Sequence, residues 1–97
     1  MEITSYQVEW IRDPFGILTG KRYEFMLDLN IDEEDDLYTP NGVYIRAVYG
    51  VDGEQGKLVT YDLLEKGTDR LLEFDLEDEE EQELAEFCSQ HWNEAEE

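Results

Sequence analysis

Carboxylates crowd one short segment of the chain at a spacing that is typical of calcium ligands. Asp28, Asn30 and Asp32 stand where an EF-hand loop carries its first three ligands. The sixth position of such a loop requires Gly and here is Glu33, and the twelfth requires Glu and here is Thr39. A solvated acidic segment, with weak and unspecific binding of divalent cations, is therefore favoured over a specific calcium site.

Two acidic groups are candidate partner-binding residues. The first group consists of five successive carboxylates, Asp32, Glu33, Glu34, Asp35 and Asp36. The second group lies on the outer face of an expected C-terminal helix and near its end, and consists of Glu79, Glu80, Glu83, Glu86 and Trp92. Aromatic side chains rimmed by charge are frequent at protein interfaces. The alternative role for the tryptophan is to seal the edge of a helix–sheet core.

Cys88 and His91 are three residues apart on the same expected helix, where a thiol and a base could be neighbours. Both fall on the apolar stripe of that helix, beside Leu84 and Phe87, and abundant carboxylates raise the pKa of a cysteine. We therefore expect a core cysteine and a helix-end histidine, and no enzymatic activity. The sequence contains no phosphate-binding glycine loop and no serine-nucleophile motif, so no cofactor is expected.

The charge of the chain limits its partners. Its 97 residues include 27 Asp and Glu against 7 Lys and Arg, which gives a net charge of −20. Such a surface is repelled by nucleic-acid phosphates and by anionic lipids, so neither a nucleic acid nor a membrane is an expected partner. A basic surface on another protein is the expected partner, because long-range attraction speeds such an encounter. DNA mimicry, with carboxylates in place of phosphates, is a narrower version of this hypothesis.

The remaining composition indicates a folded domain of the cytoplasm. Apolar residues make up 40% of the chain and aromatic residues 12%, which is unlike a disordered acidic tail. The single cysteine allows no intramolecular disulfide, as is usual in a reducing compartment. Residues 1–5 carry neither a basic region nor an apolar run, so we expect no secretory signal. No stretch approaches the roughly 18 apolar residues of a membrane helix.

Alternating apolar residues predict the strands that position these groups. A period of two residues predicts strands at 3–11, 21–31, 43–51, 57–64 and 70–75. In the fourth strand, Val59, Tyr61 and Leu63 are expected to share one face. Short connections between successive strands indicate an antiparallel meander.

The period changes after the fifth strand. Leu84, Phe87, Cys88 and His91 recur at helical spacing and predict a helix at about 77–92, capped by Asp75 or Asp78. The predicted fold class is α+β: a five-stranded antiparallel β-meander with one C-terminal helix packed on the sheet. Residues 1–92 would form a single domain, and residues 93–97 a short acidic tail.

The segment from Asp13 to Leu18 lies between the first two predicted strands and carries a proline and a glycine among apolar residues. Such a loop either folds back to plug the end of a small core or forms an exposed binding loop, and the plug is favoured.

Several stretches resemble a small family of uncharacterised proteins from Bacillus and related Firmicutes. They are DPFGILTGKRYEF at 13–25, DEED at 32–35, NGVYIR at 41–46 and the Glu-rich run before Phe87 and Cys88. The resemblance covers nearly the whole chain and implies a domain of unknown function, so no functional residue is carried over. Some relatives bear the label "pullulanase", which we do not transfer, because starch-debranching enzymes of that name use a barrel of roughly 250 residues or more.

The leading functional hypothesis is a non-enzymatic, acidic protein–protein interaction module that docks a basic partner surface. The alternative is a divalent-cation or small-ligand binding protein that uses the acidic segment at 28–36.

Overall fold

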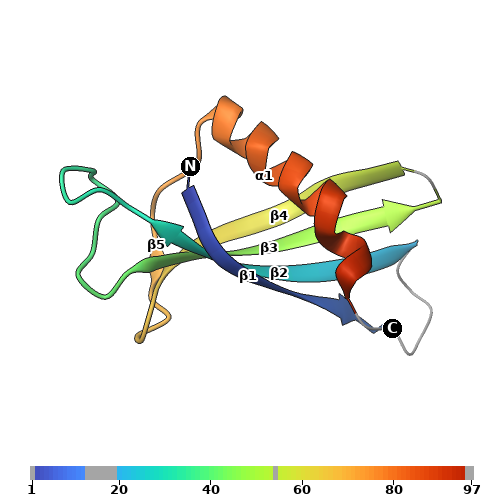
Figure 1. The fold of residues 1–97 in the computed structure, drawn as a ribbon, viewed down its shortest axis with the longest axis horizontal. Helices are drawn as coiled ribbons and strands as arrows, with labels where there is room; N and C mark the ends of the chain where they lie inside the picture. The colour runs from blue at the N-terminus through green and yellow to red at the C-terminus, as the bar shows by residue number, and fades with distance from the viewer. Residues whose placement is uncertain (1, 13–19, 54, 96–97) are drawn as a thin grey trace.

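A computed structural model describes residues 2–12, 20–53 and 55–95 of the chain. Its elements, in order, are β1 (Glu2–Ile11), β2 (Lys21–Asn30), β3 (Val43–Asp52), β4 (Gln55–Glu65), β5 (Leu71–Leu72), α1 (Asp78–His91) and the 3₁₀ turn η1 (Trp92–Glu94). The strands form one antiparallel sheet in the order β1-β2-β3-β4-β5, and α1 lies across one face of it (Figure 1). The predicted α+β meander with one C-terminal helix is therefore confirmed.

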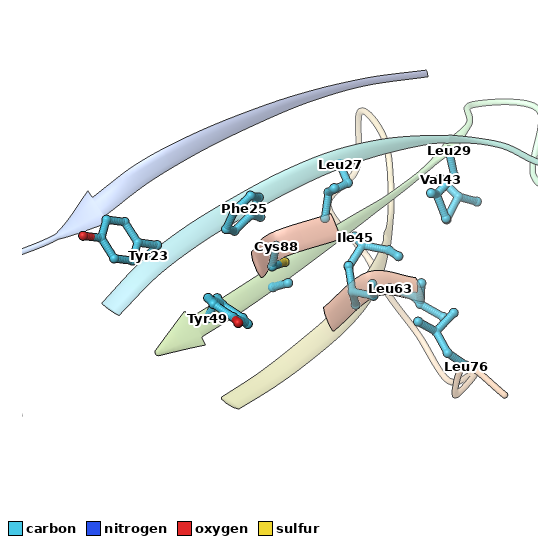
Figure 2. Close-up of a cluster of buried hydrophobic side chains, with 12 residues drawn as sticks. Tyr23, Phe25, Leu27, Leu29, Val43, Ile45, Tyr49, Leu63, Leu76 and Cys88 are labelled. Atoms are coloured by element: carbon cyan, nitrogen blue, oxygen red, sulfur yellow. The ribbon is translucent and has the colours of Figure 1, made fainter. Parts of the chain in front are cut away.

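The core lies between α1 and the covered face of the sheet. The alternating residues of β2 and β3 point into it, and they are Tyr23, Phe25, Leu27, Leu29, Val43, Ile45, Ala47 and Tyr49. Leu84 and Cys88 of α1 are fully buried against them, and the Cys88 thiol lies among the side chains of β2 and β3 (Figure 2). These are the faces that the period of two in the strands and the period of 3.6 in the helix predict.

A β-bulge corrects the predicted face of β4. Val48 pairs with Thr60 and Tyr49 pairs with Leu58, so Val59 is an extra residue without a partner on β3. The bulge turns Val59 to the sheet face away from α1, where 42% of its surface is exposed. Leu58 packs against the core in its place. The expectation that Val59 shares a face with Tyr61 and Leu63 is therefore wrong.

The segment between β4 and α1 also differs from the prediction. The fifth strand is limited to Leu71–Leu72 rather than 70–75, and α1 begins at Asp78. Its N-cap is Glu77, neither Asp75 nor Asp78, and the backbone N–H of Glu77 donates to Glu80 Oε1 at 3.2 Å. This reciprocal cap arises because a carboxylate three residues into the helix can reach back to the N-cap amide.

The chain end is tied to the first strand. Tyr6 Oη of β1 donates to Glu94 Oε1 at 2.8 Å and lies 3.2 Å from His91 Nδ1, which also contacts Glu94 Oε2. Ala95 packs against the core. The first residues of the expected 93–97 tail thus contact the folded domain, and residues 96–97 lie outside the described part of the chain.

The loop expected to plug the core, from Asp13 to Leu18, lies outside the described residues. Within the ranges that are described, no helix is both long and apolar enough to cross a membrane.

Candidate functional site

The acidic loop after β2 and the segment that leads into α1 line one hollow, which we call the acidic groove. Its volume is about 460 Å³. Seven carboxylates line it: Glu2, Asp32, Asp35, Asp36, Asp75, Glu77 and Glu80. The rest of its lining is Asn30 and six apolar side chains, Leu29, Ile31, Leu37, Leu63, Phe74 and Leu76. No Lys or Arg is among these described lining residues, so the groove is a negatively charged rim around an apolar floor.

The acidic loop is shaped by its own aspartates. Asp32 Oδ1 accepts the backbone N–H of Glu34 at 3.1 Å, and Asp35 Oδ1 accepts that of Leu37 at 2.9 Å. Two backbone bonds, Asp35 N to Asp32 O and Tyr38 N to Asp35 O, close the corresponding turns at 2.9 Å each. Aspartate favours such turns because its short carboxylate reaches the amide two residues on. Leu37 then packs against the core and fixes the loop beside the sheet.

Tyr61 of β4 fixes the opposite wall of the acidic groove. Its hydroxyl accepts the backbone N–H of Leu76 at 3.1 Å and donates to Glu81 Oε1 at 2.8 Å. Burial, followed by the hydrogen bond to Glu81, raises the pKa of Tyr61, so the phenol stays neutral at physiological pH. One side chain therefore holds both the entry segment and the first turn of α1 against the sheet.

Phe74 is the most exposed part of the floor, with 47% of its surface accessible. It follows β5 in a segment without regular structure and stands between Glu73 and Asp75. An aromatic ring surrounded by carboxylates offers a stacking surface for the alkyl stem or head group of a basic side chain.

The structure brings together some of the predicted partner-binding residues and separates others. Asp32, Asp35, Asp36 and Glu80 all line the acidic groove. Six other predicted residues are not part of its lining: Glu33, Glu34, Glu79, Glu83, Glu86 and Trp92. The glutamates among them are exposed on the loop or on α1. Trp92 is half-buried, packs on Tyr23 with ring centroids 5.3 Å apart, and belongs to the periphery of the core.

Sequence reasoning missed three carboxylates and the exposed aromatic ring of the groove. Glu2, Asp75 and Glu77 come from two segments far apart in the sequence, and Phe74 was assigned to a fifth strand. The only available signal was the order Glu-Phe-Asp at 73–75, which places an aromatic residue between acidic ones.

The pair Cys88 and His91 does not form a thiol–base couple. Burial raises the pKa of Cys88 to about 12, so the thiol is protonated at neutral pH. The Nδ1 atom of His91 contacts Glu94 and Tyr6 instead. Among the residues that the structure describes, no three His, Cys, Asp or Glu side chains are grouped so that they could hold a metal ion.

A family model matches residues 1–95 of the chain, and its description is a family of unknown function. No curated protein and no solved structure matches the chain.

Proposed function

The chain belongs to DUF6509, a family of unknown function, and we propose that it is a non-enzymatic interaction module that binds a basic segment of a partner protein in the acidic groove. The observation that carries this proposal is the meeting of seven carboxylates around an apolar floor, without a basic residue in the described lining. Lysine and arginine match that arrangement, because their alkyl stems cover apolar surface while their charged heads remain at a polar rim.

Electrostatics favour this type of occupant. Carboxylates that line one hollow repel one another, and a cationic segment reduces this repulsion when it binds. The attraction extends over about 8–10 Å at physiological ionic strength, so it accelerates the encounter and becomes weaker as salt is added. The apolar floor, and Phe74 in particular, adds a contact that salt does not screen.

The test compares two double variants that change the net charge equally. Asp36→Asn with Asp75→Asn removes two carboxylates from the groove, and neither side chain makes a hydrogen bond within the described structure. Glu79→Gln with Glu86→Gln removes two exposed carboxylates from α1 outside the groove. Each tagged protein is used to capture partners from cell lysate, which are eluted with a NaCl gradient and identified by mass spectrometry.

The expected result is one dominant basic protein that the wild type and the α1 variant retain and the groove variant loses. Titration of that partner should then show a loss of affinity of about tenfold or more in the groove variant, and a smaller loss in the α1 variant. Phe74→Ala should weaken binding at every salt concentration. Equal losses in the two double variants would show that the whole negative surface, and not the groove, attracts the partner.

A further inference from the structure

A second hollow lies on the sheet face away from α1, near the hairpin between β3 and β4. It is built around one row of the sheet, in which Arg22 of β2 pairs with Gly50 of β3 and Gly50 pairs with Lys57 of β4. Neighbouring strands are about 4.8 Å apart, so two cationic side chains flank a residue without a side chain. The hollow has a volume of about 300 Å³, and Asp52 and Gln55 also line it.

Gly50 makes room for the guanidinium of Arg22. A Cβ atom at this position would lie 2.5 Å from Arg22 Nη1 and 3.2 Å from Val59 Cγ2. The guanidinium therefore lies over the backbone of β3 at Gly50, and a methyl group of the bulged Val59 lies close to the same point. Arg22 and Lys57 thus line the same hollow from the two strands on either side of Gly50.

Neither cation is neutralised by a carboxylate of the described structure. Arg22 and Lys57 form no ion pair with any described residue, although the chain has 27 acidic residues. Other basic residues on the same face are paired, since Arg46 lies 3.4 Å from Asp62 and Lys66 lies 3.2 Å from Asp28. Among the residues that the structure describes, two unpaired positive charges are thus a local feature of this hollow and not a general property of the face.

We propose that this hollow binds the phosphate group of a small molecule. A planar guanidinium donates two parallel hydrogen bonds to phosphate oxygens, and the lysine ammonium adds a point charge. Two positive charges match a phosphate dianion better than a singly charged carboxylate. Gln55 supplies an amide donor at the rim. Asp52 is a like charge that weakens binding of the anion. This site lies outside the acidic groove and does not depend on the function proposed for it.

The test is an NMR titration of the full chain, labelled with ¹⁵N, at constant ionic strength set with chloride. The probes are inorganic phosphate and phenyl phosphate. The expected result is a saturable shift of the Gly50 and Gly56 amide signals with at least one probe. Tighter binding of phenyl phosphate would assign the site to a phosphate ester, and equal binding would assign it to free phosphate. Absence of saturation with both probes would overturn the proposal.

Matched variants separate the site from general electrostatics. Arg22→Gln and Lys57→Gln should each weaken phosphate binding by about tenfold or more, because each removes one of the two charges. Gly50→Ala should weaken it similarly by displacing the guanidinium while all charges remain. Asp52→Asn should strengthen it. Arg46→Gln, on the same face and with the same change in charge, should change the affinity for phosphate by no more than about twofold relative to wild type. An equal loss in Arg46→Gln would overturn the proposal.

Discussion

Glu65 shows how a single carboxylate can join several segments. It is buried at the end of β4, where Thr39 Oγ1 donates to its Oε2 at 2.6 Å and Thr68 Oγ1 donates to its Oε1 at 2.8 Å. Arg70 lies 3.8 Å from the same carboxylate. Glu65 therefore holds the end of the acidic loop and the turn before β5 together. The hydrogen bonds from Thr39 and then Thr68 lower its pKa because they stabilise the charged form.

Glu65→Gln should lower the Tm at pH 7. The carboxylate accepts the two threonine hydroxyls with its two oxygens, whereas the glutamine amide has only one oxygen. A lowered folded-state pKa contributes stability above the unfolded-state pKa, and this contribution is lost as the pH falls through the folded-state value. The difference in Tm between wild type and variant should therefore shrink from pH 7 toward pH 3, as measured by circular dichroism. Glu79→Gln, an exposed control, should show no comparable pH-dependent difference.

Cys88 should be inert toward thiol reagents in the folded protein. A pKa of about 12 leaves on the order of a thousandfold less thiolate at pH 8 than the usual value of 9.0 would. Ellman's reagent should therefore react with Cys88 only when the protein unfolds, so that the labelling rate follows the denaturant transition. Rapid, stoichiometric labelling in buffer would contradict the burial of this side chain.

At the scale of elements, the period of the sequence predicted most of the fold because each strand buries one face only. The alternation from Tyr23 to Leu29 determines which face of β2 is buried, since a shift of the strand register by one residue would expose all of these apolar side chains. The bulge at Val59 escaped prediction because an extra residue inverts the pattern of β4 without changing its composition. The fifth strand was predicted at 70–75 but pairs only at Leu71–Leu72, and so short a paired segment gives no periodicity from which its ends could be predicted.

The acidic groove could be predicted only in part. The sequence identified the carboxylates of the acidic loop because five of them follow one another. The site, however, forms where residues 29–37 and 74–80 come together, and this contact was not predicted. That contact depends on the hydroxyl of Tyr61, which binds the entry segment and the first helical turn. A long-range hydrogen bond of this kind leaves no pattern in the sequence, so the meeting of these two segments could not be predicted from it.

The helix should depend on its buried stripe for its attachment to the sheet. Leu84 is fully buried, so Leu84→Ala should lower the free energy of unfolding by about 2–5 kcal/mol, measured by urea denaturation. Gln82→Ala, at an exposed position of the same helix, should change it by about 0.5 kcal/mol or less. Similar losses in both variants would contradict the conclusion that the buried side of α1 attaches it to the sheet.

At the scale of the whole molecule, charge is distributed unevenly. No Lys or Arg follows Arg70 in the sequence, so α1 and its flanks carry carboxylates and one histidine. Arg22, Arg46 and Lys57 lie instead on the opposite face of the sheet. The molecule is therefore much more negative on the helix side than on the open sheet face, and its two candidate sites lie in regions of different potential.

Salt should stabilise the folded protein. A net charge of −20 produces self-repulsion in the compact state, which added ions screen. The Tm should rise between about 10 mM and 150 mM NaCl. CaCl₂ and MgCl₂ at equal concentrations should raise it to similar extents if they act as a diffuse ion atmosphere. A saturable rise specific to calcium would favour the divalent-cation alternative, and a Tm that falls with NaCl would contradict the repulsion argument.

The short β5 has a consequence for the solubility of the protein. Because β5 pairs only with Leu63 and Leu64, most of the outer edge of β4 has no described neighbouring strand, and β1 is the opposite edge of the sheet. Strand edges such as those of β1 and β4, which have no described neighbouring strand along most of their length, are templates for intermolecular strand pairing and aggregation. The negative charge opposes that pairing at neutral pH. Near the pI of about 4.1 the opposition disappears, and light scattering should then increase. The acidity of this chain should thus also protect it against aggregation at neutral pH.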